Sequence, residues 1–431
     1  MEHKKLAIGV LIVLVAAMAA CVSASAREAS SAHSAVLAGS GGLPETASRN
    51  VQASDERGLA YVAPAPSHGA QELAQGAPGW QQVNSNGFGD RQTGEVSAVE
   101  AFNGQLYAGI SNAIGGARIF RSPDGTTWTP VTQPGFGISH DIMPPSILDL
   151  TVFGGRLYAS TGRGDGPGQI WRALDGVNWA PMVIHGFGDP DTVDITALVV
   201  FNDAIYAGAH SLISGAQIWR SFSGDSNTWT QVAPKVPGTG AVRVTGFAVF
   251  GGALYAAVES GAPAQIWRSS GGDWATIVSD GFGNSLTTST GGMAEFAGQL
   301  YVGAGNVVNG AQLWRTKDGA IWEQAIVPGF GASNNQQVEM VFVFQNHLYV
   351  SVRNVATGIQ LWRSPDGTLW ERANQDGFGD SNNSSSNWND ATAGFLGGLY
   401  VGTSNVVDGG ELWRMQQQRR RTYLPLVLRW P

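Results

Sequence analysis

The chain has 431 residues, of which 13% are charged and 59 are glycine. Low charge with abundant glycine and tryptophan is typical of strands and turns rather than helices. The formal net charge of −8 argues against a nucleic-acid-binding protein, because such proteins usually carry a basic face. The single cysteine, Cys21, excludes an internal disulfide, so stability must come from core burial and strand pairing.

Residues 1–26 have the pattern of a signal peptide. A short basic start precedes the apolar stretch Leu6–Ala20, which is too short for a comfortable membrane span. Ala24–Ala26 then fits the small-residue pattern that signal peptidase prefers. Lipidation at Cys21 is the alternative reading, and it alone would attach the protein to a membrane. Either reading predicts an extracytoplasmic protein, secreted or at the cell surface.

Two segments flank the predicted folded domain. Residues 27–78 are rich in Ala, Ser, Gly and Pro without a sustained period, and this composition predicts a flexible linker. Residues 418–431 form a basic and then apolar tail. The tail weakly resembles those that close some exported bacterial proteins, and a frayed or surface-docked end is the alternative.

A repeated pattern fills residues 79–417. Phe, three residues, Leu or Ile, and then Tyr recur seven times, and each copy is followed by Ile/Leu-Trp-Arg, with Phe120 replacing Trp in the first. An Asp-Gly…Trp phrase and Gly-Phe-Gly complete a period of about 48 residues. The repeated tyrosines are Tyr107, Tyr158, Tyr206, Tyr255, Tyr301, Tyr349 and Tyr400.

Each repeat divides into four short predicted strands, A to D. In the first repeat they lie near 96–102, 105–110, 117–122 and 126–131, separated by turn signals such as Asn103-Gly104 and Asp124-Gly125. Four antiparallel strands at this period predict a blade of a β-propeller. The sequence thus predicts an all-β, seven-bladed propeller of four-stranded blades.

The two ends of the repeat region predict how the ring closes. The last repeat stops after a C strand near 411–415, whereas an unaccompanied D-like strand at residues 79–84, containing Trp80, precedes the first repeat. We expect this strand to pair with the last C strand near Leu412–Arg414 and to complete the seventh blade.

The phrase Ser-Pro-Asp-Gly-Thr-Thr-Trp at 122–128 resembles the Asp-box of sialidase-like propellers, Ser/Thr-x-Asp-x-Gly-x-x-Trp, although Asp and Gly adjoin here. The resemblance covers the architecture of residues 79–417. It implies a structural box on the face away from an active site, with the Asp capping turn amides and the Trp packing between blades. The box residues are Asp124, Asp175, Asp318 and Asp366.

The same resemblance makes glycoside cleavage the enzyme activity to test. Sialidases use an arginine triad and an early Phe/Tyr-Arg-Ile-Pro phrase, and this sequence lacks that phrase. We interpret the seven arginines repeated in the C strands as structural, paired with box aspartates or turn carbonyls. Acids near the A strands share no register and are interpreted as solvated or pore-lining, although their oxygens would suit a structural calcium ion. These acids are Glu95, Asp149, Asp194, Glu339 and Asp390.

The D–A and B–C loops vary between repeats and predict a recognition face. Trp388 is the one propeller tryptophan outside the repeat register, and it lies among Asn, Ser and Asp. It is typical of a sugar-stacking platform, with plugging of the pore as the alternative. The residues predicted to line this face are Trp388, Asp390, Asn387, Asp380, Asp90, Asp189 and His140.

The sequence therefore favours a non-catalytic binding or scaffolding propeller for a glycan or an extracellular protein. No cofactor, nucleic acid or histidine-based metal site is expected. The alternative is a sialidase-like glycoside hydrolase on the same scaffold, and site chemistry rather than fold must decide between them.

Overall fold

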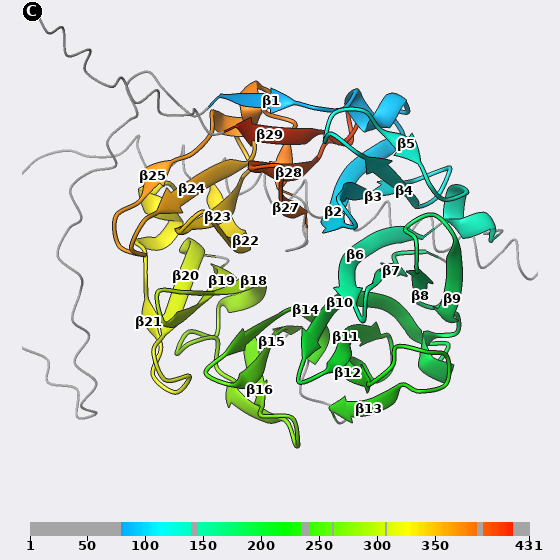
Figure 1. Ribbon diagram of the computed structural model, residues 1–431. Helices are drawn as coiled ribbons and strands as arrows, with labels where there is room; N and C mark the ends of the chain where they lie inside the picture. Colours follow the sequence, from blue (N-terminus) through cyan, green and yellow to red (C-terminus); the bar gives the residue numbers. More distant parts are fainter. Residues whose placement is uncertain are drawn as a thin grey trace, which may run out of the picture. The chain divides into compact units, whose positions relative to one another are not determined.

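The computed structural model describes residues 79–138, 145–164, 166–233, 241–260, 263–306, 308–385 and 391–416. The chain divides into two units, residues 1–65 and 66–431, and every described residue belongs to the second. This part is built almost entirely of antiparallel β-strands (Figure 1). Within the described ranges, no helix has the length and apolar character needed to cross a membrane.

The strands pair as consecutive four-stranded antiparallel meanders. The first contains β2 (Thr93–Phe102), β3 (Gln105–Asn112), β4 (Arg118–Ser122) and β5 (Thr129–Pro130). The second contains β6 (Ser146–Phe153), β7 (Arg156–Gly162), β8 (Ile170–Ala173) and β9 (Trp179–Val183). The third contains β10 (Thr192–Phe201), β11 (Ala204–Ser211), β12 (Gly215–Ser221) and β13 (Thr230–Ala233).

The same pairing continues along the chain. The fourth meander contains β14 (Ala241–Phe250), β15 (Ala253–Ser260), β16 (Gln265–Ser269) and β17 (Ala275–Val278). The fifth contains β18 (Thr287–Phe296), β19 (Gln299–Asn306), β20 (Gly310–Thr316) and β21 (Glu323–Gln324). The sixth contains β22 (Asn335–Phe344), β23 (His347–Asn354), β24 (Gln360–Ser364) and β25 (Glu371–Arg372).

The last meander joins the two ends of the described chain. It contains β27 (Thr392–Phe395), β28 (Gly398–Ser404), β29 (Leu412–Gln416) and, as its outer strand, β1 (Trp80–Gln82), while β26 (Ser384–Ser385) also pairs with β28. In β1, Trp80 pairs with Met415 and Gln82 with Trp413 (Figure 1). The predicted closure by an N-terminal outer strand is confirmed.

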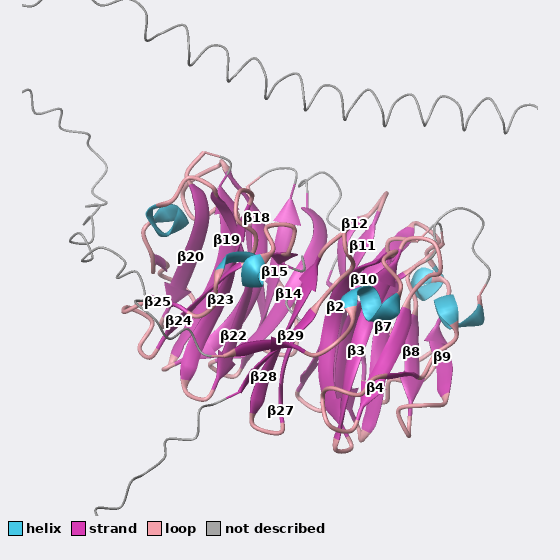
Figure 2. Cartoon of the chain, turned by 90° about the horizontal axis from the view of Figure 1, so that it is seen from above, coloured by secondary structure: helices cyan, strands magenta, loops and turns pink. Residues whose placement is uncertain are grey.

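The first strand of each meander lies nearest the centre of the ring (Figure 1). Short 3₁₀ helices precede several of these strands and lie on one side of the sheets (Figure 2). They are η2 (Asn86–Gly89), η3 (Pro134–Gly137), η4 (Gly186–Gly188), η5 (Pro328–Gly331) and η6 (Asp376–Gly379). The loops on this side are the D–A and B–C loops that the sequence assigns to recognition.

The strand bounds differ from the sequence prediction at both ends of the first meander. β2 begins at Thr93, three residues before the predicted start, because its first residue still pairs with Asn112 across a bulge. β5 is only Thr129–Pro130. The amides of Thr126 and Thr127 bond the Asp124 carboxylate instead of a neighbouring strand, which shortens the outer strand.

An aromatic triad joins each Gly-Phe-Gly turn to the meander that follows it. Phe136 stacks on Trp171 with ring centroids 4.4 Å apart and meets Trp179 edge-on at 5.9 Å. Phe136 has φ of +57°, a conformation that bulky residues rarely adopt. The stacking contact offsets this backbone cost, and equivalent contacts recur at Phe187, Phe282, Phe330 and Phe378.

The repeated tyrosines also connect neighbouring meanders. A Cβ placed on Gly176 would lie 1.9 Å from Tyr107 Oη, so the Asp-Gly turn must carry glycine for the tyrosine to reach it. Gly125 stands in the same relation to Tyr400, across the joint between the last and first meanders. These contacts give the repeated tyrosines a structural role, because each of the two reaches a turn of a neighbouring meander.

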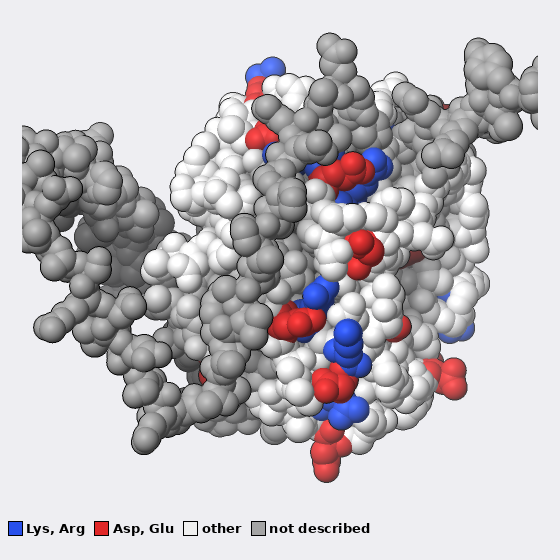
Figure 3. All heavy atoms as spheres, turned by 90° about the vertical axis from the view of Figure 1, so that its left-hand side faces the viewer, with Lys and Arg blue, Asp and Glu red and all other residues white. Residues whose placement is uncertain are grey.

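One flank of the molecule, over the strands around β20 to β25, shows basic residues beside acidic ones rather than a basic field (Figure 3). Its ion pairs are Arg315–Glu323, Arg363–Glu371 and Arg372–Asp376. Arg315 Nη1 also donates to the carbonyl of Gly367 in the next turn, at 3.4 Å. Exposed pairs of this kind each contribute little to stability, and their mixed charges do not form a basic patch for a polyanion.

Candidate functional site

Charged residues gather where the inner strands begin, on the side of the D–A and B–C loops. Several inner strands carry a bulge directly after their first residue, as between Thr93 and Glu95 and between Thr192 and Asp194. Bulges re-aim side chains and are common beside functional sites. Glu95 and Asp194 are both the third residue of their strand, whereas Asp149 is the fourth and Glu339 the fifth residue of theirs, so these acids do not share one register.

Neighbouring meanders also touch at this level through single strand pairs. Glu95 of β2 pairs with Ser404 of β28, and His210 of β11 pairs with Arg243 of β14. The charged residues that meet around these pairs are called the central cluster here. Its members are Glu95, Arg163, Asp194, His210, Arg243, Glu259, Glu339 and Arg353.

Arg163 connects three meanders within the central cluster. Its Nη1 lies 2.7 Å from Glu95 Oε2, and its backbone N–H donates to Asp194 Oδ1 at 2.6 Å. The other Asp194 oxygen, Oδ2, lies 3.0 Å from His210 Nδ1. Burial opposes the charged form of Asp194, but the bonds from His210 and the Arg163 amide, with the charge of Arg243, lower its pKa.

A second arm of the cluster is formed by Arg243 and Glu259, whose Nε and Oε2 atoms lie 2.6 Å apart. Both side chains stay partly exposed, at 34% and 30%. Because Arg243 also pairs with His210 along the strands, this arm is continuous with the Asp194 site.

The third arm is Glu339 and Arg353, with Arg353 Nε 3.3 Å from Glu339 Oε1. The Glu339 side chain is 3% exposed, and its burial raises its pKa to about 8. The positive charge of Arg353 lowers this pKa, whereas the negative charge of Glu95 raises it further. Glu339 Oε2 makes no hydrogen bond of normal geometry within the described residues. With a pKa of about 8, Glu339 is mostly uncharged at pH 7 beside the Arg353 guanidinium.

A pH-dependent loss of stability should follow from Glu339. Its pKa is higher in the folded state than the ordinary value of 4.5, so the folded protein holds this proton where the unfolded chain has lost it. The resulting stabilisation is complete below about pH 4.5 and is lost as the pH rises through about 8. Glu339→Gln should therefore lose less stability than the wild type between pH 5 and 8, measured by urea unfolding.

The exposed Glu323→Gln variant is the control and should follow the wild type. Glu100 has a pKa raised by burial to about 7 and titrates in both proteins, so the difference between them reports Glu339. Parallel pH profiles for wild type and Glu339→Gln would contradict the assignment.

Asp149, another of the predicted acids, has a different role. Its carboxylate is buried and accepts the backbone N–H of Leu198 in the neighbouring inner strand. It therefore joins two meanders, as Ser97 does through its 2.6 Å bond to the Ile147 carbonyl. Asp390 lies outside the described residues.

The residues predicted for the recognition face divide into two groups. Trp388, Asn387 and His140, like Asp390, lie outside the described residues, so they remain predictions. Asp90, Asp189 and Asp380 each follow a Gly-Phe-Gly turn and are bonded within the protein.

The bonds of these three aspartates repeat one pattern. Asp90 accepts the amide of Gln92 and the side chain of Asn112, and Asp380 accepts the amide of Asn382 and the side chain of Asn405. Asp189 accepts the amide of Asp191. Asp90 and Asp380 thus tie a D–A loop to the end of the second strand of the same meander. The ion pairs that define the central cluster involve other residues.

The four box aspartates sit in the C–D turns. Asp124 Oδ1 accepts the amides of Thr126 and Thr127 at 2.8 and 2.7 Å. The equivalent bonds from Asn178 and Val177 lower the pKa of Asp175 to about 2. Asp318 and Asp366 bond the amides two and three residues ahead in the same way.

Two features escaped the sequence interpretation. In most repeats a glutamine two residues before the C-strand tryptophan accepts its indole N–H, as Gln169 does for Trp171 at 2.8 Å. The last repeat has Glu411 in place of the glutamine, and its carboxylate accepts the indole N–H of Trp413 at 2.8 Å. The first repeat lacks both partners, with Arg118 and Phe120. The unrepeated Arg163, Arg243 and Arg353 were also missed, and an alignment of the repeats column by column would have separated them from the strand C arginines.

The described residues contain no group of three or more His, Cys, Asp or Glu side chains able to hold a metal ion. The chemistry of the central cluster is instead that of three guanidinium groups beside carboxyl groups. Arginine recognises carboxylate and other planar anions through paired hydrogen bonds.

No protein-family model matches the chain, and no curated protein matches it. Several solved structures do match the chain. An ulvan lyase of polysaccharide lyase family PL25, bound to -[GlcA(1-4)Rha3S]-, is 10% identical with a TM-score of 0.50, covering 77% of this chain and 94% of its own. The β-propeller domain of the Trilobed protease from Pyrococcus furiosus is 7% identical (TM-score 0.46, 75% and 95% covered).

A Trypanosoma rangeli sialidase is 14% identical, with a TM-score of 0.45 and coverage of 78% of this chain and 59% of its own. The chain spans about half the length of a prolyl endopeptidase that it matches (12% identity, TM-score 0.46, 75% and 50% covered). At these identities the likeness concerns the fold alone, and sialidases and other propeller proteins are among the structural neighbours. The β-propeller fold of the chain itself is seen in its ring of antiparallel meanders (Figure 1).

Proposed function

We propose that the chain is an extracytoplasmic, seven-bladed propeller that binds a carboxylate-bearing glycan at the central cluster without turning it over. The observation that carries the proposal is that three arginines outside the strand repeat each form an ion pair with an acid of the central cluster. Arg163, Arg243 and Arg353 have side chains 31%, 34% and 39% exposed, so their charges stay accessible.

Within the cluster, Arg353 is the best placed to take a ligand carboxylate. Its partner Glu339 is mostly protonated at pH 7, so the guanidinium charge has no full counter-charge there. The protonated Glu339 could in turn donate a hydrogen bond to the same ligand oxygen. An unesterified uronic acid or a sialic acid supplies this carboxylate together with hydroxyl groups.

Trigalacturonate and sialyllactose are suitable probes, with the methyl ester of trigalacturonate as the uncharged control. We expect the wild type to bind a charged probe in calorimetry and Arg353→Gln to weaken binding by about tenfold or more, because a charge-assisted bond is lost. Arg91→Gln removes the same charge from an exposed loop on the same side and should bind as the wild type does.

Equal affinity for the methyl ester, or equal affinity of Arg353→Gln and wild type, would contradict the proposal. The same assays can follow cleavage of the probes.

A glycoside-processing enzyme is the second candidate, favoured by one observation: a buried carboxyl group that is protonated at neutral pH is suited to general acid catalysis. Turnover of a fluorogenic glycoside that disappears in Glu339→Gln or Asp390→Asn would establish it.

A further inference from the structure

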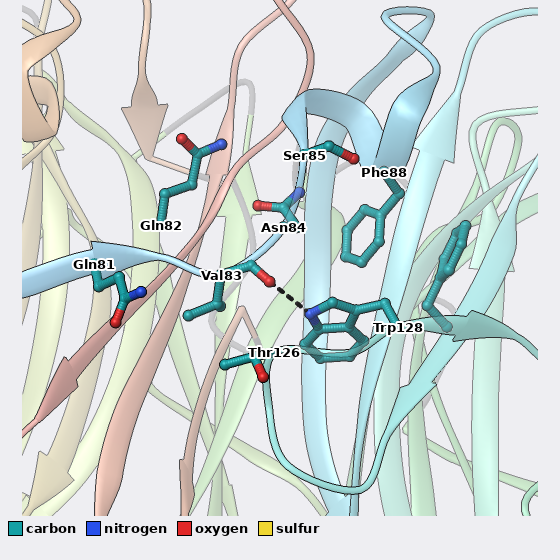
Figure 4. Close-up of a pocket in the computed structure, with 9 residues that line it drawn as sticks. Gln81, Gln82, Val83, Asn84, Ser85, Phe88, Thr126 and Trp128 are labelled. Atoms are coloured by element: carbon teal, nitrogen blue, oxygen red, sulfur yellow. Dashed lines mark hydrogen bonds between the residues drawn. The ribbon is translucent and has the colours of Figure 1, made fainter.

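A pocket of about 420 Å³ lies away from the central cluster, where β1 meets the first meander (Figure 4). Its volume falls within the range of small-ligand pockets, about 300–1,000 Å³. It is formed by the outer strand that closes the ring on one side and by β4 and the turn after it on the other. The lining residues are Gln81, Gln82, Val83, Asn84, Ser85, Phe88, Phe120, Thr126 and Trp128.

The pocket coincides with the place where the repeat is broken. At the equivalent position of the second meander, Trp171 stacks flat on Phe136, with ring planes 6° apart, and donates its N–H to Gln169. Here the smaller Phe120 stands against Phe88 with the planes 25° apart. The indole ring that fills the equivalent space in the other meanders is missing here. Arg118 takes the position of the residue that accepts the indole N–H elsewhere, because no such acceptor is needed beside Phe120.

The aromatic wall of the pocket is held in one orientation. Trp128 Nε1 donates to the carbonyl of Val83 at 2.9 Å, and the Trp128 ring meets Phe88 at right angles with centroids 5.4 Å apart (Figure 4). Trp128 is partly buried, so part of its surface remains accessible. A fixed indole of this kind offers a stacking surface at little entropic cost.

The polar wall is uncharged. Carboxamides come from Gln81, Gln82 and Asn84, and hydroxyl groups from Ser85 and Thr126 (Figure 4). Gln82 is positioned by its 2.7 Å bond to Asn86. Amides and hydroxyls both donate and accept hydrogen bonds, as sugar hydroxyls do, and none of the lining side chains could pair with a ligand charge.

We propose that this pocket is a second binding site and that it takes a neutral saccharide, with the sugar ring against Trp128 and its hydroxyls on the carboxamides. The site differs from the central cluster in place and in chemistry: one would select uncharged sugar residues and the other a carboxylate. A chain with both would hold a mixed polysaccharide at two points.

The test uses cellotetraose, mannotetraose and laminaritetraose as neutral probes, followed by tryptophan fluorescence and saturation-transfer NMR. Binding of at least one probe is expected. Phe120→Trp, combined with Arg118→Gln to restore the acceptor found in other repeats, should fill the pocket and weaken binding by about tenfold or more.

Gln82→Ala tests the polar wall without changing the core, and Gln324→Ala is its matched control, because Gln324 pairs with Trp314 as Gln82 pairs with Trp413. The first should weaken binding several-fold and the second should not. Arg353→Gln should leave neutral-probe binding unchanged, which separates this proposal from the central cluster.

Three results would overturn the proposal. The first is that no probe binds at a concentration of about 10 mM, because a site with a dissociation constant above this value would be too weak to be useful. The second is unchanged affinity in both Phe120→Trp/Arg118→Gln and Gln82→Ala, and the third is binding that is seen only after residues 418–431 are removed. The last result would make the C-terminal segment the occupant of the pocket.

Discussion

Removal of residues 79–84 is expected to lower the melting temperature by many degrees, whereas removal of residues 27–75 should hardly change it. β1 supplies the outer strand of the last meander through its pairs with β29. Trp80 meets Phe378 edge-on at 5.1 Å and donates its N–H to the Ala373 carbonyl at 2.7 Å. Loss of a packed tryptophan costs about 3–5 kcal/mol, before the lost strand pairing is counted.

Thermal melts of the two truncated proteins, followed by circular dichroism, provide the measurement. Trp80→Ala in the full-length chain should reproduce most of the effect, since the indole makes both the aromatic and the hydrogen-bond contact. If the two deletions shift the melting temperature equally, β1 does not close the ring in solution.

Gly176→Ala is the second substitution with a large expected effect. Its φ is +74°, which costs alanine about 1–2 kcal/mol, and the added Cβ would fall 1.9 Å from Tyr107 Oη of the preceding meander. Relief of that overlap requires displacement of a buried tyrosine, at a further cost of about 1–3 kcal/mol.

Gly155→Ala is the matched control, because Gly155 has φ of +68° but no atom within 4 Å of the position that an added Cβ would take. The difference in unfolding free energy between Gly176→Ala and Gly155→Ala, from urea titration, measures the contact between meanders alone. A difference near zero would show that the tyrosine moves without cost.

Much of the fold could be predicted because the same sequence pattern recurs in every meander. The period of about 48 residues and the orphan strand at Trp80 are sufficient for the meanders and their closure. The length of β5 could not be read in the same way, since Thr126 and Thr127 look strand-like until the Asp124 carboxylate takes their amides. Side-chain competition for backbone groups decided the boundary.

The central cluster was harder to predict for a physical reason. Counting alternate residues back along β2 from its later core positions crosses the bulge between Val96 and Ala98, so the side on which Glu95 emerges cannot be inferred from those positions. Its partner Arg163 comes from another meander, 68 residues away. The recurring Gly-Phe-Gly-Asp phrase, which contains Asp90 and Asp380, could have predicted the bonds that these aspartates make within their own meanders.

The closing strand also sets an order of events during folding. Trp80 lies at the start of the described residues, whereas the strand it pairs with, β29, ends at Gln416 near their end. The first six meanders can form from local contacts between strands adjacent in sequence, but β1 must wait as an unpaired strand until β29 has been synthesised. Ring closure is therefore the latest step, and it joins the most distant segments of the chain. Until then the row of open amides and carbonyls on β29 is the part of the molecule most prone to pair with another chain.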